Sequence, residues 1–224
     1  SRPFDVIESI AYPLPIIVIS ELLGVRPDDR QSFARWSADI ARSIEPTISR
    51  NEAHRVEQSR DALNQYFSNV IEERRRQPEE DLISRLVQAE EGGEKLSLEE
   101  MLSLLRLLLI AGNETTKNLI GNGLLALLCN PGELERLRSE PSLMESAVEE
   151  MLRFDSPVQV DLRTVGENTV VGGTEMSCGQ RVLAVIGAAN RDPEAFPDPN
   201  TLDLSRNDRP NMSFGRGIHH CLGA

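Results

Sequence analysis

The sequence predicts a mainly α protein that carries small β-sheets, an α+β fold. Up to about residue 157, apolar residues recur at the three- and four-residue spacing of amphipathic helices. Beyond that point, short runs of β-type composition are separated by glycine turns. We therefore expect one partial domain over residues 1–224, with a helical part at about 1–157 and a strand and loop part at about 158–224.

Composition narrows the class of function. The 224 residues carry a formal charge of −12, which argues against nucleic-acid binding because that needs a basic surface. The densest basic run, Arg74-Arg75-Arg76, lies between acidic residues and is expected to be the solvated end of a helix. The cysteines, Cys129, Cys178 and Cys221, are odd in number and widely spaced, which favours a reducing compartment over a disulfide framework.

The apolar stretches are too short to predict membrane spans, and the two ends of the sequence predict a fragment of a longer protein. No signal peptide is visible at the start. The apolar stretches 14–19 and 102–111 fall short of the roughly 20 residues that a span needs, so we expect buried helices there. The chain opens at Ser1-Arg2-Pro3 and closes at Gly223-Ala224, and we expect a carboxy-terminal fragment that is incomplete at both ends.

Amphipathic periodicity predicts a series of helices in the first ninety residues. The first is interrupted near Pro13 and Pro15 and stopped by Gly24, because proline lacks an N–H and glycine favours helix ends. Further breaks are expected at Glu45-Pro46 and at the turn Glu91-Gly92-Gly93. The predicted helices span residues 5–23, 29–44, 51–77 and 81–89.

The next helix is the longest in the sequence. Ser97 and Glu100 match a capping box at its start, and the pattern runs to Cys129, about 33 residues or on the order of 50 Å. Its first half is apolar almost all round, which predicts a path through the core. A short helix is expected over 131–140, and Ser142 with Glu145 matches a second capping box before a helix that ends at Asp155.

The remaining third has another character. Strands are expected within 158–171 and 181–186, with turns at Gly172-Gly173 and Cys178-Gly179. Residues 190–212 are rich in Pro, Asp and Asn and show little periodicity. A loop of that length in a compact domain is usually functional.

The strongest chemical signal is the decapeptide of residues 214–223, Phe-Gly-Arg-Gly-Ile-His-His-Cys-Leu-Gly. Gly215 and Gly217 allow positive φ and close backbone approach to a flat group, and backbone N–H groups near Cys221 would favour a thiolate. One alternative is a buried, inert cysteine. Another is a zinc or copper site made by His219, His220 and Cys221, but adjacent ligands are poorly spaced for tetrahedral closure.

This decapeptide resembles the haem-binding loop of the cytochrome P450 family, bacterial soluble type. The resemblance implies the P450 fold, a haem b cofactor, and Cys221 as the axial thiolate ligand of the haem iron. It also implies that His219 contacts a haem propionate and that Phe214, Gly215 and Gly217 help to bind the cofactor.

A second motif, Ala-Gly-Asn-Glu-Thr-Thr at residues 111–116, lies within the long helix. Thr115 can bond back to the carbonyl group of Ala111 and open the helix locally, although a tolerated glycine and a surface glutamate are the plainer reading. The resemblance implies that Glu114 relays protons, that Thr115 holds the oxygen and water network, and that Ala111 and Gly112 lie at the cofactor.

A third motif is Glu150-Met151-Leu152-Arg153. Residues three apart share a helix face, so Glu150 and Arg153 can pair, commonly as a surface salt bridge. By resemblance the pair locks the loop beneath the haem, and Arg163 binds a propionate. Thr201 stands where many relatives carry an arginine that completes this lock, with Arg206 close by. The resemblance implies a substrate pocket lined by Leu107, Ile110, Val158, Gln159, Val160 and Asp161.

The resemblance implies a haem-thiolate monooxygenase, an enzyme that inserts one atom of O₂ into an organic substrate. The expected substrate is small and apolar, and the expected electron donor is a separate ferredoxin or flavodoxin with an NAD(P)H-dependent reductase, in the cytoplasm. Two alternatives stay open. One is a haem-thiolate peroxygenase, isomerase or dehydratase that does not use O₂. The other is a helical binding protein that never holds haem.

Overall fold

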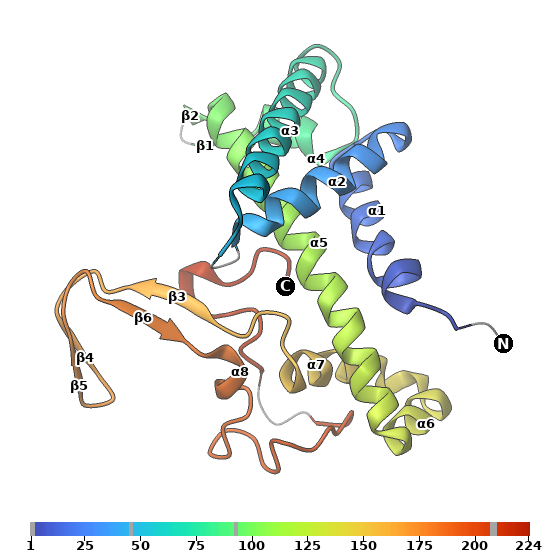
Figure 1. Ribbon diagram of the computed structural model, residues 1–224, viewed down its shortest axis with the longest axis vertical. Coiled ribbons are helices and arrows are strands. Elements are labelled where there is room, and N and C mark those ends of the chain that lie inside the picture. The colour runs from blue at the N-terminus through green and yellow to red at the C-terminus, as the bar shows by residue number, and fades with distance from the viewer. Residues whose placement is uncertain (1–2, 45–46, 92–93, 207–209) are drawn as a thin grey trace. The chain divides into compact units, whose positions relative to one another are not determined.

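The computed structural model describes residues 3–44, 47–91, 94–206 and 210–224. It is mainly helical, with small antiparallel sheets, as the sequence predicts (Figure 1). Contacts divide the chain into two compact units, Ser1–Lys117 and Asn118–Ala224. Helix α5 (Leu98–Cys129) begins in the first unit and ends in the second. The breaks expected at Glu45-Pro46 and Gly92-Gly93 lie outside the described residues.

The elements of the first unit follow the predicted helices closely. Pro13 opens α1 and Pro15 lies in its first turn, where backbone N–H groups have no partner within the helix, so neither proline breaks it. A π-helical turn at Ile7–Ala11 precedes α1. The unit contains α1 (Pro13–Leu22), α2 (Arg30–Ala41), α3 (Arg50–Arg76), α4 (Leu82–Gln88), the strands β1 (Glu90–Glu91) and β2 (Glu94–Lys95), and the first part of α5.

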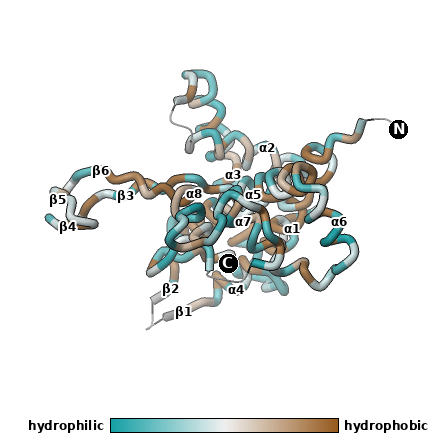
Figure 2. The backbone as a smooth tube through the Cα atoms, turned by 90° about the horizontal axis from the view of Figure 1, so that it is seen from below, coloured by the Kyte–Doolittle hydropathy of each residue, from teal (hydrophilic) through white to brown (hydrophobic). Residues whose placement is uncertain are grey.

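The core of this unit is built on aromatic side chains from α2 and α3. Phe33 is fully buried and meets Phe67 edge to face at 5.4 Å and Tyr66 at 5.8 Å between ring centroids. Leu105 and Leu109 bring α5 into the same cluster, together with residues of α1 and α4. Brown and teal residues mix along the helices in Figure 2, as amphipathic packing requires.

One buried ion pair joins the end of α3 to the start of α4. The Nε atom of Arg74 donates to Asp81 Oδ2 at 2.6 Å, and both side chains are almost fully buried. Burial alone raises the pKa of Asp81, but hydrogen bonds from Arg74 and Ser84 outweigh it and hold that pKa below its ordinary value. The expectation that Arg74 is solvated is therefore wrong, because it neutralises the carboxylate that caps α4.

Capping boxes were predicted for two helix starts. The one at Ser97 is confirmed, since Glu100 accepts from Ser97 N at 2.8 Å and Ser97 Oγ accepts from Glu100 N at 3.3 Å. The one at Ser142 is wrong, because Pro141 begins a 3₁₀ turn that carries the chain to Leu143 before the helix starts. A further box, Ser49 with Glu52, starts α3.

The second unit combines short helices, two strand pairs and a long irregular segment, of which residues 190–206 and 210–212 are described. Its elements after α5 are α6 (Pro131–Ser139), α7 (Met144–Phe154), β3 (Asp161–Thr164), β4 (Thr169–Val171), β5 (Thr174–Met176), β6 (Arg181–Ala184) and α8 (Ile186–Ala189). Strand β3 pairs with β6, and β4 pairs with β5 across Gly172 and Gly173, whose φ values are 55° and 79°. The core contains Ala126, Leu127, Ala147, Leu202 and Leu204.

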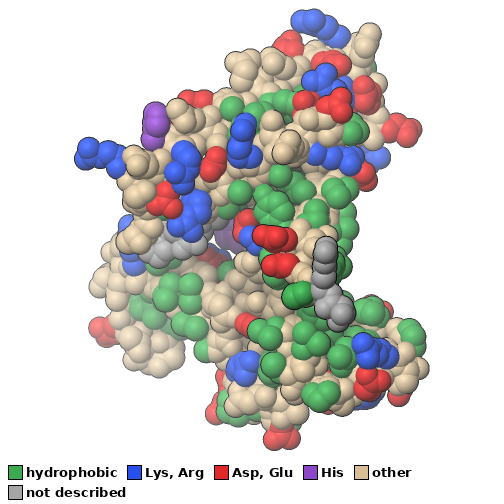
Figure 3. Space-filling model, turned by 45° about the vertical axis from the view of Figure 1, so that its right-hand side comes forward, with side chains coloured by type: hydrophobic (Ala, Val, Ile, Leu, Met, Phe, Trp, Pro, Cys, Tyr) green, Lys and Arg blue, Asp and Glu red, His purple; other side chains and the backbone are tan. Residues whose placement is uncertain are grey.

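Large apolar side chains also remain on the surface. On α1, Val18 and Leu22 are 57% and 54% exposed, and the facing pair Leu162 and Leu183 of β3 and β6 is exposed to a similar degree. Figure 3 shows hydrophobic side chains gathered in patches. Among the described residues, no helix is both long and apolar enough to cross a membrane.

A substitution at Gly24, in the turn after α1, tests the close packing of this turn against Asp81. Gly24 has a φ of +69°, and a Cβ atom built there would lie 2.9 Å from the Cβ of buried Asp81. We expect Gly24→Ala to lower the free energy of unfolding of the whole protein by about 1–3 kcal/mol in urea denaturation. Gly132→Ala is the matched control, because nothing lies within 4 Å of the added atom. Equal stability of the two variants would contradict the proposed strain.

The Ser49 capping box predicts a pH dependence. Hydrogen bonds from the backbone and side chain of Ser49 lower the pKa of Glu52 to about 2 from the ordinary 4.5. A lowered pKa means that this contribution to stability is present above about pH 4.5 and is lost as the pH falls toward 2. Carboxyl NMR titration should find the low pKa in the wild type and a higher pKa in Ser49→Ala, which keeps the backbone N–H donor to Glu52 but loses the hydroxyl donor. A wild-type value near 4.5 would refute the cap.

Candidate haem-ligand loop and its support

The Cys221 loop, residues 214–223, is held by backbone hydrogen bonds. Cys221 N donates to Phe214 O at 2.9 Å, which closes the loop, and Gly223 N lies 3.4 Å from the Cys221 sulfur as a donor. A 3₁₀ turn at Gly217–His219 precedes the cysteine. An N–H group directed at sulfur favours negative charge there, as a thiolate ligand requires.

Glycine is required in this loop for its backbone conformation. Gly215 and Gly217 have φ values of 67° and 77°, in the left-handed region that other residues rarely adopt. A Cβ atom at Gly215 would come no closer than 3.9 Å to another atom, and at Gly217 it would meet nothing within 4 Å. The positive φ value, and not a lack of space for a side chain, therefore requires glycine at these two positions.

The side chains around the sulfur fit a large apolar cofactor such as haem. Cys221 is an exposed free thiol, so it is not the buried, inert cysteine that the sequence left open. Ile218 and Leu222, which flank it in the sequence, are apolar side chains that are 98% and 80% exposed. Phe214 is half-buried and His219 is exposed. Among the described residues, no group of His, Cys, Asp and Glu could hold a metal ion by itself.

The structure brings Glu150 and Arg153 together in the interior of the second unit. Each is 2% exposed, and the guanidinium donates to both carboxylate oxygens at 2.7 and 2.8 Å. This is a buried bidentate pair rather than a surface salt bridge. It belongs to one face of α7, one turn from the end of the helix.

Arg153 also binds the irregular segment through backbone carbonyl groups. Its terminal nitrogens donate to Asn190 O at 2.8 Å, Pro199 O at 2.8 Å and Thr201 O at 3.2 Å. The long loop that follows α8 is thus attached to α7 at points far apart in the sequence. Thr201 contributes its carbonyl oxygen here.

Arg206 supplies a second guanidinium to Glu150. Its Nε lies 3.3 Å from both carboxylate oxygens, and its side chain is 8% exposed. It donates further to the carbonyl groups of Pro197 at 2.8 Å and Asp198 at 3.4 Å. Sequence reasoning left Arg206 unassigned, although its place five residues after Thr201 was the available signal. We name Glu150, Arg153 and Arg206 the Glu150 cluster.

Arg163 and the residues before it lie at the surface of the second unit. Arg163 pairs with Asp161 at 2.5 Å on β3, and its side chain is 54% exposed. Val158 and Val160 are exposed as well, at 38% and 45%. The amide of Gln159 instead folds back and donates to Ser156 O at 2.7 Å, so it belongs to the chain turn after α7.

The acid and alcohol motif lies on α5 in the first unit. Thr115 Oγ1 donates to Ala111 O at 2.7 Å, the back-bond expected from the sequence, and α5 stays an uninterrupted helix across it. Glu114 is partly buried and pairs with Lys117, which sequence reasoning missed. Gly112 faces α1, because a Cβ there would lie 3.7 Å from Ile19.

The neighbouring positions of α5 differ in exposure. Leu107 is 61% exposed, whereas Ile110 is half-buried against the core cluster. Asn113 is fully buried and donates to Ser37 Oγ on α2 at 3.1 Å. This hydrogen bond joins the 111–116 motif to α2, and the sequence pattern did not predict it.

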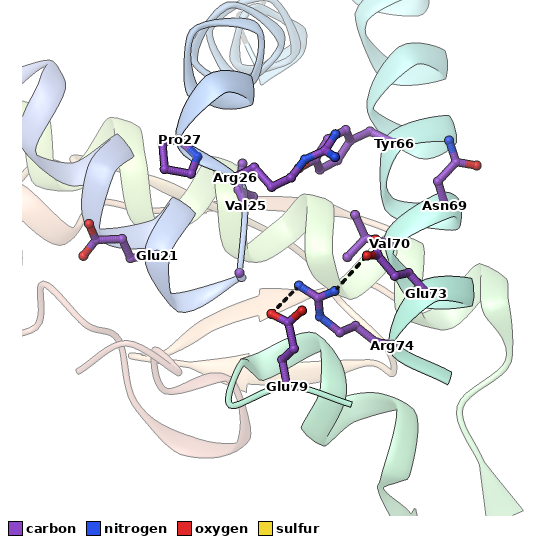
Figure 4. A pocket seen from close by; sticks show the side chains of 11 residues that line it. Glu21, Val25, Arg26, Pro27, Tyr66, Asn69, Val70, Glu73, Arg74 and Glu79 are labelled. Atoms are coloured by element: carbon purple, nitrogen blue, oxygen red, sulfur yellow. Dashed lines mark ion pairs between the residues drawn. The ribbon is translucent and has the colours of Figure 1, made fainter. Parts of the chain in front are cut away.

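A cavity of about 550 Å³ in the first unit is lined by both charged and apolar side chains (Figure 4). Glu73 and Glu79 lie on either side of Arg74, and Glu79 pairs with it at 2.9 Å. Glu21 pairs with Arg30, and Arg26 pairs with Asp29. Each of the five charged side chains that line the cavity thus has an ion-pair partner, which is more charge than a haem or substrate pocket usually presents.

Comparison with known proteins identifies the relatives of this chain. The family model described as cytochrome P450 matches residues 32–224. The cytochrome P450 YjiB of Bacillus subtilis is 46% identical over 226 residues, which cover 99% of this chain and 57% of that protein. Vitamin D(3) 25-hydroxylase of Pseudonocardia autotrophica is 42% identical, with 99% and 54% covered.

Solved structures agree with this result. The ligand-free structure of cytochrome P450 TbtJ1 has a TM-score of 0.94 and 40% identity, covering 98% of this chain and 58% of that one. The chain therefore spans about half the length of the relatives that it matches.

The Glu150 cluster makes a prediction about stability. Arg153→Ala would leave Glu150 with one cationic partner and remove the donor from three carbonyl groups, so we expect a loss of about 3–5 kcal/mol in the free energy of unfolding. Arg138→Ala is the control, since its side chain is 66% exposed and pairs on the surface, and it should change stability by less than about 0.5 kcal/mol. Similar losses in both variants would show that burial of the cluster contributes little.

Proposed function

The chain belongs to the cytochrome P450 family, and on that premise we propose that the whole protein is a haem-thiolate monooxygenase that inserts one atom of O₂ into an organic substrate. The observation that carries the proposal is the exposed Cys221 thiol in a loop closed by the Phe214 carbonyl, with a backbone N–H directed at its sulfur. Such a thiol is available as a ligand and is not a structural core residue.

We propose haem b as the cofactor and Cys221 as its axial ligand. Gly215 and Gly217 let the backbone pass close to a flat group, and the exposed Ile218 and Leu222 supply apolar contact area. His219 and Arg163 are exposed polar groups that suit the propionates. When bound, haem activates O₂ so that one oxygen atom enters the substrate and the other leaves as water.

Glu114 and Thr115 are proposed to manage protons in this reaction. The carboxylate of Glu114 is partly buried and held by Lys117, three residues along the same helix face. The hydroxyl group of Thr115 donates a hydrogen bond to Ala111 O, which leaves the oxygen lone pairs free to accept from water or from the substrate. An acid beside an acceptor hydroxyl can take a proton from solvent and pass it on.

The substrate is proposed to be small and mainly apolar. Leu107, Val158 and Val160 present exposed apolar side chains, with Ile110 half-buried. The polar groups of Gln159 and Asp161 are bound to Ser156 O and Arg163, which leaves the apolar side chains as the main contact area. A relative at 42% identity is named for hydroxylating vitamin D(3), an apolar molecule, which supports this class. We propose cytoplasmic location and electron supply by a separate ferredoxin or flavodoxin with an NAD(P)H-dependent reductase, in keeping with the bacterial relatives.

Replacement of the ligand tests the proposal. In Cys221→Ser we expect loss of the strongly red-shifted Soret band of the reduced, CO-bound whole protein, because a serine hydroxyl group does not replace the thiolate. Cys178→Ser is the control: Cys178 is exposed on a turn where its sulfur contacts Gly166 O, and the band should stay. If neither replacement alters the spectrum, or if haem-loaded wild type lacks the band, the proposal fails.

A further inference from the structure

Asn190 is a fully buried amide whose polar atoms all have partners. Its Nδ2 group donates to Ser156 Oγ at 2.7 Å and to Ser213 Oγ at 3.0 Å. Its Oδ1 accepts from Met212 N at 2.7 Å. The carbonyl oxygen of the same residue accepts from Arg153 at 2.8 Å, so Asn190 also touches the Glu150 cluster.

The two serine partners converge on one carbonyl group at the end of α7. Ser156 Oγ donates to Leu152 O at 2.8 Å, and Ser213 Oγ donates to the same oxygen at 2.7 Å. The two hydroxyl oxygens also lie 2.9 Å apart, where either can donate to the other. When both protons are directed at Leu152 O, both oxygens accept from the amide of Asn190. The backbone N–H of Met212, which can only donate, specifies the orientation of the amide by fixing its oxygen.

This network ends directly at the Cys221 loop. Met212 and Ser213 immediately precede Phe214, whose carbonyl oxygen accepts from Cys221 N at 2.9 Å. A displacement of Ser213 would therefore move Phe214, its neighbour in the chain, and through the hydrogen bond to Phe214 O it would move Cys221. The amide must donate twice and accept once in a dry site, and a carboxylate of the same shape cannot do so.

We propose that Asn190 is a positioning residue for the haem ligand, which sets the place of Cys221 through Met212 and Ser213. The inference rests on the proposed function, since it assumes that Cys221 binds haem iron. It assigns to Asn190 a role separate from that of Arg153 and Arg206, which hold the irregular segment through its carbonyl groups.

Asn190→Asp in the whole protein is the primary test, because it keeps the shape of the side chain and removes both donors. We expect haem affinity in a titration to fall by about tenfold or more, as for other residues that orient metal ligands, and the thiolate-type Soret band of the CO complex to weaken. Asn168→Asp is the matched control. Asn168 is exposed and its Oδ1 accepts from Cys178 N at 2.9 Å, outside this network, so affinity and spectrum should stay as in the wild type.

Ser213 provides a second pair of variants in case Asn190→Asp does not fold. Ser213→Ala removes one acceptor of the amide and should show a smaller loss in the same direction, whereas Ser213→Thr keeps the hydroxyl group and should restore affinity and spectrum. The inference is overturned if Asn190→Asp lowers only the unfolding midpoint and the folded holoprotein keeps wild-type haem affinity and spectrum. If Asn190→Asp does not fold, the same result for Ser213→Ala overturns it. A wild-type protein without the thiolate band would instead reject the proposed function, and this inference with it.

Discussion

The buried carboxylate of Glu150 is the constraint on which the second unit depends. It accepts from two guanidinium groups, those of Arg153 and Arg206, and all three side chains are almost fully excluded from water. Desolvating these charges is costly, and the cost is offset only when the remaining donors are also satisfied. Here they are satisfied by backbone carbonyl groups between residues 190 and 201, so the ion pair and the course of the irregular segment stabilise each other.

Such an arrangement gives a fixed shape to a segment without regular secondary structure. The segment buries few side chains, notably Phe196, Leu202 and Leu204, and takes the rest of its order from hydrogen bonds to its backbone. Asn190 stands where this scaffold meets the Cys221 loop, because its carbonyl group binds Arg153 and its side chain binds Met212 and Ser213. The loop that presents the exposed Cys221 thiol is thus hydrogen-bonded to this scaffold at its base.

The sequence was sufficient for features that are local. Periodicity located the helices to within a few residues, and the capping box at Ser97 lies within a single turn. Contacts between distant residues left no such pattern. Arg74 is buried because Asp81 returns to it, and Arg206 reaches Glu150 from across the irregular segment. An arginine that binds carbonyl groups imposes no residue type on those partners, so the only signal for Arg206 in the sequence was its nearness to Thr201.

The central claim is that this scaffold places the sulfur of Cys221 on haem iron. Iron K-edge X-ray absorption of the ferric whole protein reads the atoms bound to iron directly, independently of substrate and redox partner. We predict one sulfur scatterer in the first coordination shell beside the nitrogen atoms of the porphyrin. A first shell of nitrogen and oxygen atoms alone, in protein loaded with one haem, would contradict ligation by Cys221.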